Sequence, residues 1–178
     1  MMDNFEIDEI LKSMEIVVDN REHKINRAER RYKRFGVPYS FGTLSYGDYT
    51  YNAVINGQKL YDNSATILSK AVVERKMSLD ELAMCFTRGR ERFKKEFQRA
   101  TDQGAKVYLL VENGSYEKII SHSYKSKYNP KAFLASLEAF QARYNMQVVF
   151  CLETTTPTLI KEILYRELKE RLERGEFG

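Results

Sequence analysis

The stretch VVERKMSLDEL, residues 72–82, places the end of a buried strand directly before the beginning of a helix. Alternate side chains of a strand share one face, so Glu74 and Lys76 are expected to point the same way. The following SLDE segment fits a capping box, with Ser78 as the N-cap and Glu81 reaching back. A carboxylate and an ammonium group therefore project together beside a helix N-terminus, which is a favourable place for a phosphate.

Strands and helices alternate through the second half of the chain, which predicts an α/β domain with a central mixed sheet flanked by helices. Residues 1–178 are expected to form one domain, with a helical extension at residues 1–13. Strands are expected at residues 15–19, 69–76, 105–112 and 147–153, and a strand–turn–strand segment at 39–55. Helices are expected at residues 23–35, from about 78 to 103, and at 115–121, 130–144 and 156–173.

The composition is that of a soluble globular domain, with 43% hydrophobic and 30% charged residues. No apolar run approaches the roughly 20 residues that a membrane-spanning helix needs. The N-terminus is acidic where a signal peptide would be basic. Cys85 and Cys151 are too few for a disulfide framework or a zinc site. We therefore expect an intracellular protein with no membrane partner: cytoplasmic, with a nucleoid-associated or nuclear location as alternatives.

Basic residues gather at residues 23–36, 88–99 and 123–131, although the net charge is only +4. Such clusters point to a polyanion such as nucleic acid, but solvated helix faces explain them equally well on charge alone. In the second cluster the basic side chains recur at helical spacing beside the apolar stripe. This row is expected to contact DNA phosphates, with solvated ion pairs to Glu91 and Glu96 as the alternative. It consists of Arg88, Arg92, Lys95 and Arg99.

Two further carboxylates are placed to join Glu74. Asp48 follows Gly47 at the start of an extended run, and Asp19 ends the first expected strand. Three carboxylates at the ends of three strands would form an oxygen-rich site of the kind that Mg²⁺ or Mn²⁺ prefers. Each also has a simpler explanation: turn chemistry for Asp48, helix capping for Asp19, and an exposed ion pair with Lys76 for Glu74.

These residues together resemble a known signature. The order Gly47-Asp48, then ERK at 74–76, then Asp80 is similar to the GD…ERKxxxD pattern of XPF-type structure-specific DNA endonucleases. These enzymes belong to the PD-(D/E)XK, or restriction-endonuclease-like, superfamily. The segments IVVDNRE at 16–22 and VYLLVENG at 107–114 also resemble core strands of the family, so the resemblance spans roughly residues 15–165.

The resemblance implies a DNA endonuclease, a hydrolase acting on ester bonds, with Mg²⁺ or Mn²⁺ as cofactor. Asp48 and Glu74 would be the principal metal ligands, with the backbone carbonyl of Arg75 as a further ligand and Asp19 as another candidate. Lys76 would orient or activate the attacking water and offset charge on the phosphate.

The resemblance further implies that Asp19, Arg21 and Asp80 support the site through hydrogen bonds, phosphate contact or a second metal. An acidic residue in a first helical turn such as Asp80 is also favoured by the helix dipole. Two features depart from the family pattern. An extension around residues 52–69 separates Asp48 from the ERK segment, and no tandem helix–hairpin–helix module is expected within residues 1–178.

Flap, fork or Holliday-junction DNA is the expected substrate, in keeping with the family's part in DNA repair and recombination. The alternatives are a nuclease acting on linear DNA and a non-catalytic DNA-binding or dimerisation subunit. Against the last, all three residues of the ERK segment are present. A homodimer is also expected. The apolar face of the closing helix is expected to pack on the parent sheet, with a dimer interface as the alternative.

Overall fold

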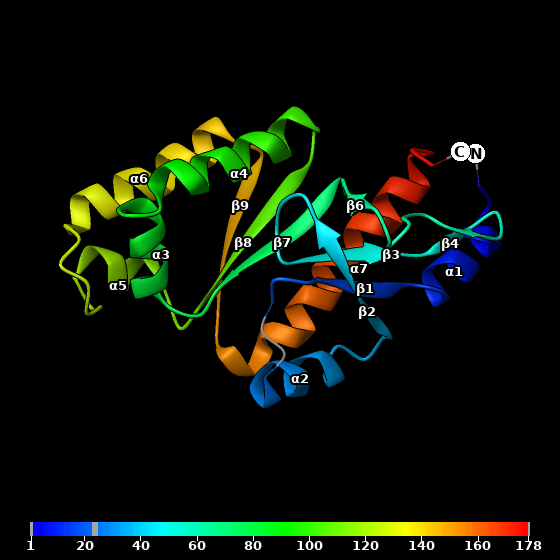
Figure 1. Ribbon diagram of the computed structural model, residues 1–178, viewed down its shortest axis with the longest axis horizontal. Helices are drawn as coiled ribbons and strands as arrows, with labels where there is room; N and C mark the ends of the chain where they lie inside the picture. Colours follow the sequence, from blue (N-terminus) through cyan, green and yellow to red (C-terminus); the bar gives the residue numbers. More distant parts are fainter. Residues whose placement is uncertain (1, 23–24, 178) are drawn as a thin grey trace.

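The computed structural model describes residues 2–22 and 25–177, and a seven-stranded mixed sheet runs through its centre (Figure 1). The strand order is β6-β2-β1-β3-β7-β8-β9. Only β3 runs antiparallel to its neighbours, β1 and β7, and all other pairs are parallel. The strands are β1 (Glu15–Asp19), β2 (Tyr39–Leu44), β3 (Tyr49–Asn52), β6 (Thr66–Ile67), β7 (Ala71–Lys76), β8 (Lys106–Glu112) and β9 (Met146–Cys151). The predicted mixed sheet is confirmed.

Helices cover both faces of this sheet, so each face buries its own apolar core. One face carries α1 (Asn4–Lys12), α2 (Asn26–Lys33) and α7 (Thr156–Glu173), with the short 3₁₀ helix η1 (Glu153–Thr155) before α7. The other carries α3 (Leu79–Phe86), α4 (Arg90–Asp102), α5 (Tyr116–Ile120) and α6 (Pro130–Arg143). Within the described residues, no helix is both long and apolar enough to cross a bilayer.

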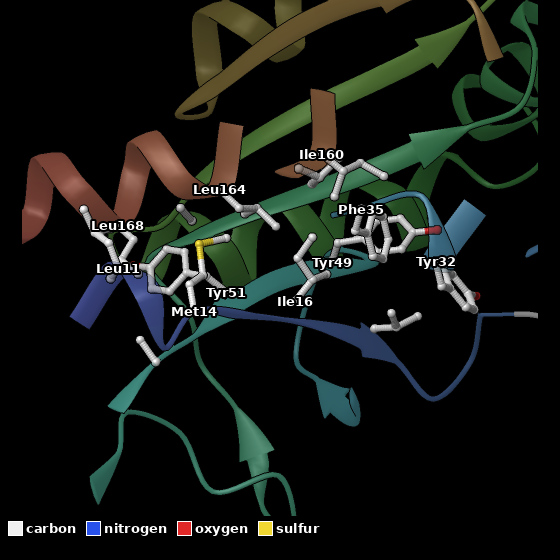
Figure 2. Packing of buried hydrophobic residues seen from close by; sticks show 14 of the residues in the cluster. Leu11, Met14, Ile16, Tyr32, Phe35, Tyr49, Tyr51, Ile160, Leu164 and Leu168 are labelled. Atoms are coloured by element: carbon white, nitrogen blue, oxygen red, sulfur yellow. The ribbon is translucent and has the colours of Figure 1, made fainter. Parts of the chain in front are cut away.

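The apolar face of α7 packs against the sheet, as Figure 2 shows for Ile160, Leu164 and Leu168. These side chains are fully buried and share a core with Ile16 of β1 and Tyr49 of β3. The expected packing of this face on the parent sheet is therefore present, while a dimer interface stays a prediction.

The helix expected from about residue 78 to 103 is two helices, α3 and α4, separated at Thr87–Gly89. The hydroxyl of Thr87 donates a hydrogen bond to the carbonyl of Ala83, which is the local competition with helical geometry that threonine provides. The apolar stripe continues across the break, with the rings of Phe86 and Phe93 5.7 Å apart. Apolar spacing alone therefore concealed the break.

The start of α3 follows the predicted capping pattern with one difference. Oγ of Ser78 accepts a hydrogen bond from the backbone N–H of Glu81, at 3.1 Å. The Glu81 carboxylate reaches back to the backbone N–H of Met77 rather than to that of Ser78, at 2.6 Å. The strand therefore ends at Lys76, two residues before the Ser78 N-cap, and its last side chains stand beside the start of the helix.

The extension at residues 52–69 folds at the end of β3 that lies away from Asp48. Asn56 and Gly57 have positive φ angles of 52° and 78°, and they join strands β4 (Val54–Ile55) and β5 (Gln58–Lys59) in the predicted hairpin. The Asn52 side chain fixes its return by exchanging two hydrogen bonds with the backbone of Tyr61. The extension is thus an ordered addition at the opposite end of β3.

Candidate active site

Asp48 is held between two strands of the sheet by its own backbone. Its N–H donates to the carbonyl of Val73, and its carbonyl accepts from the N–H of Asp19, both at 2.8 Å. The Asp48 side chain accepts a hydrogen bond from the backbone N–H of Arg75 at 2.7 Å. Gly47, which precedes it, adopts a positive φ of 74°. This turn brings Asp48 beside the ERK segment although Glu74 lies 26 positions after Asp48 in the sequence.

Glu74 and Lys76 lie on the same face of β7, as predicted. Nζ of Lys76 and Oε1 of Glu74 are 2.5 Å apart, and the two side chains are only 11% and 7% exposed. The simpler explanation, an exposed surface ion pair, is therefore wrong. Among the described residues, the second carboxylate oxygen of Glu74, Oε2, is buried and has no hydrogen-bond partner. A buried acceptor without a partner carries a free-energy cost, so Oε2 is suited to a ligand.

Burial and mutual repulsion set the protonation of this cluster. Burial, with a smaller contribution from the neighbouring carboxylates of Glu74 and Glu22, raises the pKa of Asp48 well above its usual value. Burial also raises the pKa of Glu74 to about 7, although Lys76 opposes this shift. Burial disfavours the charged ammonium of Lys76, but Glu74 and Asp48 outweigh it and raise the Lys76 pKa. Lys76 therefore stays charged at neutral pH.

These shifts predict a gain in stability for Asp48→Asn. A carboxyl group with a raised pKa binds more protons in the folded state, so the free energy of unfolding falls as pH rises from the unfolded pKa towards the folded one. Removing this carboxyl is expected to raise Tm by about 2–4 °C at pH 8 without divalent metal, and by less at pH 5. Thermal unfolding followed by circular dichroism at both pH values measures the effect. A lower Tm at pH 8 would contradict this electrostatic assignment.

The cluster opens into a cavity of about 390 Å³. Its lining combines carboxylates with cationic side chains, so it offers both metal-binding oxygens and phosphate-binding nitrogens. The acidic lining residues are Glu22, Asp48, Glu74, Glu81 and Glu96, and the basic ones are Arg21, Arg75, Lys76, Arg88 and Arg92.

The described residues contain no preformed group of three or more His, Cys, Asp or Glu side chains that could hold a metal ion. Asp19 is not part of a preformed cage, and both of its carboxylate oxygens already accept hydrogen bonds, so its role as a third ligand stays a prediction. Oδ1 accepts from the backbone N–H and Nε of Arg21, and Oδ2 accepts from the backbone N–H of Leu44 at 2.8 Å. Asp19 instead positions Arg21, whose half-exposed side chain lines the cavity.

The remaining donor set still fits Mg²⁺. This ion is commonly held by one or two carboxylates together with substrate phosphates and water, rather than by a complete protein cage. Asp48 and Glu74 supply two carboxylates, and the unpartnered Oε2 of Glu74 is the observation that favours the fit.

Asp80 has a partner outside this cluster. Its Oδ1 accepts a hydrogen bond of 2.6 Å from the backbone N–H of Ser126, 46 residues away in the sequence. Asp80 is not among the described residues that line the cavity. In this structure it ties the start of α3 to the loop before α6, and its support of the site stays a prediction.

The predicted basic row divides into two parts. Arg88, in the break between the helices, and Arg92 on α4 both line the cavity. Lys95 and Arg99 lie outside its described lining, and Arg99 donates two hydrogen bonds to the carbonyl of Ser45, at 3.0 and 3.2 Å. Arg99 thus has a structural contact, while Arg88 and Arg92 keep the position expected for phosphate contact.

Comparison with known proteins agrees with this geometry. Residues 18–158 match the ERCC4 domain. The chain belongs to the ERCC4 domain family. The structure of XPF from Aeropyrum pernix superposes with a TM-score of 0.57 at 21% identity, over 86% of this chain and 60% of that one. The same protein in complex with DNA gives 0.58 at 20% identity, over 88% and 65%. No curated protein matches the sequence.

The fold of this ERCC4 domain is therefore that of an XPF-type nuclease domain, which is restriction-endonuclease-like as expected. The chain spans less than two thirds of the XPF chains that it matches.

Three carboxylates that line the cavity of the ERCC4 domain were not predicted as site residues: Glu22, Glu96 and Glu81, of which Glu81 was expected only to cap the helix. Glu22 accepts a hydrogen bond of 2.8 Å from the hydroxyl of Tyr49, and Glu96 accepts one of 3.0 Å from the backbone N–H of Gly47. The position of Glu22 three residues after Asp19 was an available signal. Glu96 lies 49 residues from Gly47, so no local pattern indicates that contact.

Glu96 is expected to hold the turn that presents Asp48. Glu96→Ala removes the acceptor of the Gly47 N–H, whereas Glu96→Gln keeps a side-chain oxygen there. We expect Glu96→Ala to lower the rate of DNA cleavage about tenfold or more and Glu96→Gln to retain most of it. Single-turnover cleavage of a labelled flap measures both rates. Equal rates for Glu96→Ala and wild type would show that this bond does not position Asp48.

Proposed function

We propose that this ERCC4 domain is a divalent-metal-dependent endonuclease that hydrolyses phosphodiester bonds of DNA. The observation that carries the proposal is the unpartnered Oε2 of Glu74, buried beside Asp48 and the charged Lys76 in an open cavity. Membership of the family, and the existence of a relative's structure in complex with DNA, support the choice of substrate.

Asp48 and Glu74 would hold Mg²⁺ or Mn²⁺, together with the backbone carbonyl of Arg75. When bound, such a cation polarises a phosphoryl oxygen and offsets the charge that develops on it. Arg75 also lines the cavity, but its guanidinium group is already paired, because Nε and Nη2 form a buried ion pair with Glu112 at 2.7 and 3.0 Å. The Arg75–Glu112 ion pair joins the ends of β7 and β8, and so fixes the part of β7 that carries the Arg75 carbonyl.

Lys76 contributes a fixed positive charge to the reaction. The flanking carboxylates keep its ammonium protonated, and the ring of Phe93 lies 5.3 Å from Nζ on the cavity side. A preorganised cation in a water-poor site stabilises negative charge in the transition state better than a mobile one. Arg21, Arg88 and Arg92 line the same cavity and would bind flanking phosphates.

We further propose branched DNA, such as a flap, fork or Holliday junction, as the preferred substrate, and a homodimer as the assembly. Both proposals rest on the resemblance of the GD…ERKxxxD segment to XPF-type endonucleases and on membership of the ERCC4 domain family.

The test is a panel of labelled linear, flap, fork and four-way DNA incubated with purified protein and either Mg²⁺ or Mn²⁺. The proposal predicts metal-dependent cleavage, fastest on branched substrates. Equal rates on linear and branched DNA would overturn the substrate preference alone. Binding without cleavage under either metal would instead favour the non-catalytic DNA-binding or dimerisation subunit.

A further inference from the structure

A second cavity of about 380 Å³ lies between α2 and the η1–α7 junction, and four arginines line it. In Figure 1 these elements lie side by side, with α2 in blue next to the orange start of α7. We call this cavity the arginine cleft. Its arginines are Arg27, Arg30, Arg31 and Arg34, and the facing wall includes Glu153 and Thr154. They belong to the basic cluster at residues 23–36, of which residues 23 and 24 lie outside the described part.

The four arginines stand on one side of α2, because positions three and four apart share a helix face. Contacts with the opposite wall hold two of them in place. Nε of Arg27 donates to Glu153 at 2.7 Å, and Nη2 of Arg34 donates to the carbonyl of Thr154 at 2.7 Å. The guanidinium groups therefore face one space that a single ligand can occupy.

The charge of the arginine cleft is only partly compensated. Arg27 is paired with Glu153, and the buried Arg31 lies 3.5 Å from Glu22. Within the part of the chain that the structure describes, no carboxylate is paired with Arg30 or Arg34. Two guanidinium groups therefore remain for an anion, and their planar N–H pairs match the geometry of a phosphate.

The arginine cleft adjoins the catalytic cavity through a shared contact. Oε2 of Glu22 accepts a hydrogen bond from the Tyr49 hydroxyl and also faces Nη2 of Arg31. Nε of Arg31 lies 3.1 Å from the same hydroxyl oxygen and donates to it. Since Glu22 lines the catalytic cavity and Arg31 lines the arginine cleft, one extended polyanion can reach both spaces.

We propose that the arginine cleft binds a backbone phosphate of the DNA substrate, remote from the bond that is cleaved. This inference rests on the proposed function, and it assigns Arg30 and Arg34 as the phosphate contacts. DNA is the occupant that the observations favour, because a chain of phosphodiesters supplies an anion to both cavities at once. The cleft thereby fixes the direction in which the DNA leaves the catalytic cavity.

Fluorescence anisotropy of labelled flap DNA in EDTA, across a range of salt concentrations, tests this proposal without requiring cleavage. The Arg30→Gln/Arg34→Gln double variant is expected to bind about tenfold more weakly than wild type. Its salt dependence, log K against log [salt], should be shallower by about one for each phosphate that the variant no longer binds. Lys33→Gln is the matched control: Lys33 is exposed on the same helix but does not line the cleft, so its affinity should stay within about twofold.

Arg30→Gln alone guards against a folding artefact, because it breaks none of the wall contacts described above, and it should still weaken binding severalfold. If wild type binds DNA but both arginine variants match it in affinity and salt dependence, the cleft is not a phosphate site and the proposed function stands. If Lys33→Gln weakens binding as much as the double variant does, general charge and not the cleft is responsible, which also overturns the proposal. If wild-type protein does not bind DNA, the proposed function itself fails.

Discussion

Replacing Asp48 with asparagine is expected to reduce the rate of DNA cleavage by about 10³-fold or more, while DNA affinity changes by less than about twofold. Asparagine preserves the acceptor for the Arg75 N–H but removes one of the two negative charges that would hold the metal. The arginines that would bind the DNA are untouched. Single-turnover cleavage and anisotropy on the same flap substrate separate the two effects.

Asp8→Asn is the control for this variant, because it removes the same charge from an exposed position on α1, away from the cavity lining. It should cleave at the wild-type rate. If Asp48→Asn cleaved DNA at the wild-type rate, the Asp48 carboxylate would not be needed for catalysis. A parallel loss of DNA affinity would instead point to misfolding or to a binding role.

Gly47→Ala is expected to lower the free energy of unfolding by about 3 kcal/mol and Tm by roughly 6–12 °C. Gly47 has a positive φ, and a Cβ built there would lie 2.6 Å from Cβ of Val72 in β7. Val72 is fully buried and cannot move aside. Relief of the clash must displace the turn that carries Asp48, so cleavage below the melting temperature should also fall about 100-fold.

Gly57→Ala separates backbone strain from this clash. Gly57 has a similar φ of 78°, but a Cβ there would meet no atom within 4 Å. Gly57→Ala should therefore lower the free energy of unfolding by only about 1 kcal/mol and leave the rate of DNA cleavage unchanged. Similar losses of stability in the two variants would mean that close packing against Val72 does not constrain the turn.

The parts of the site that sequence reasoning predicted correctly depend on local periodicity. A strand places Glu74 and Lys76 on one face whatever lies around it, and Ser78 must begin the helix that follows. The alternation of apolar strands and helices likewise indicated the mixed sheet. Such local patterns predict the structure well because tertiary packing buries the same faces that the local periodicity makes apolar.

The parts that the sequence did not predict depend on partners far away in the chain. Asp19 had the right position for a metal ligand, but Leu44 and Arg21 already occupy its oxygens. Asp80 binds the Ser126 N–H, and no spacing rule could predict that contact. The break between α3 and α4 at Thr87–Gly89 was not predicted because the apolar stripe continues across it.

The cleavage rate of flap DNA as Mn²⁺ is titrated, measured for wild type and for Glu74→Gln, tests most directly whether Asp48, Glu74 and Lys76 form a catalytic site. Glutamine keeps an acceptor for Lys76 but removes the carboxylate whose second oxygen lacks a partner. We predict that the wild-type rate rises with Mn²⁺ to a plateau and that Glu74→Gln gives no product at any concentration. Cleavage by Glu74→Gln at the wild-type rate would contradict the assignment.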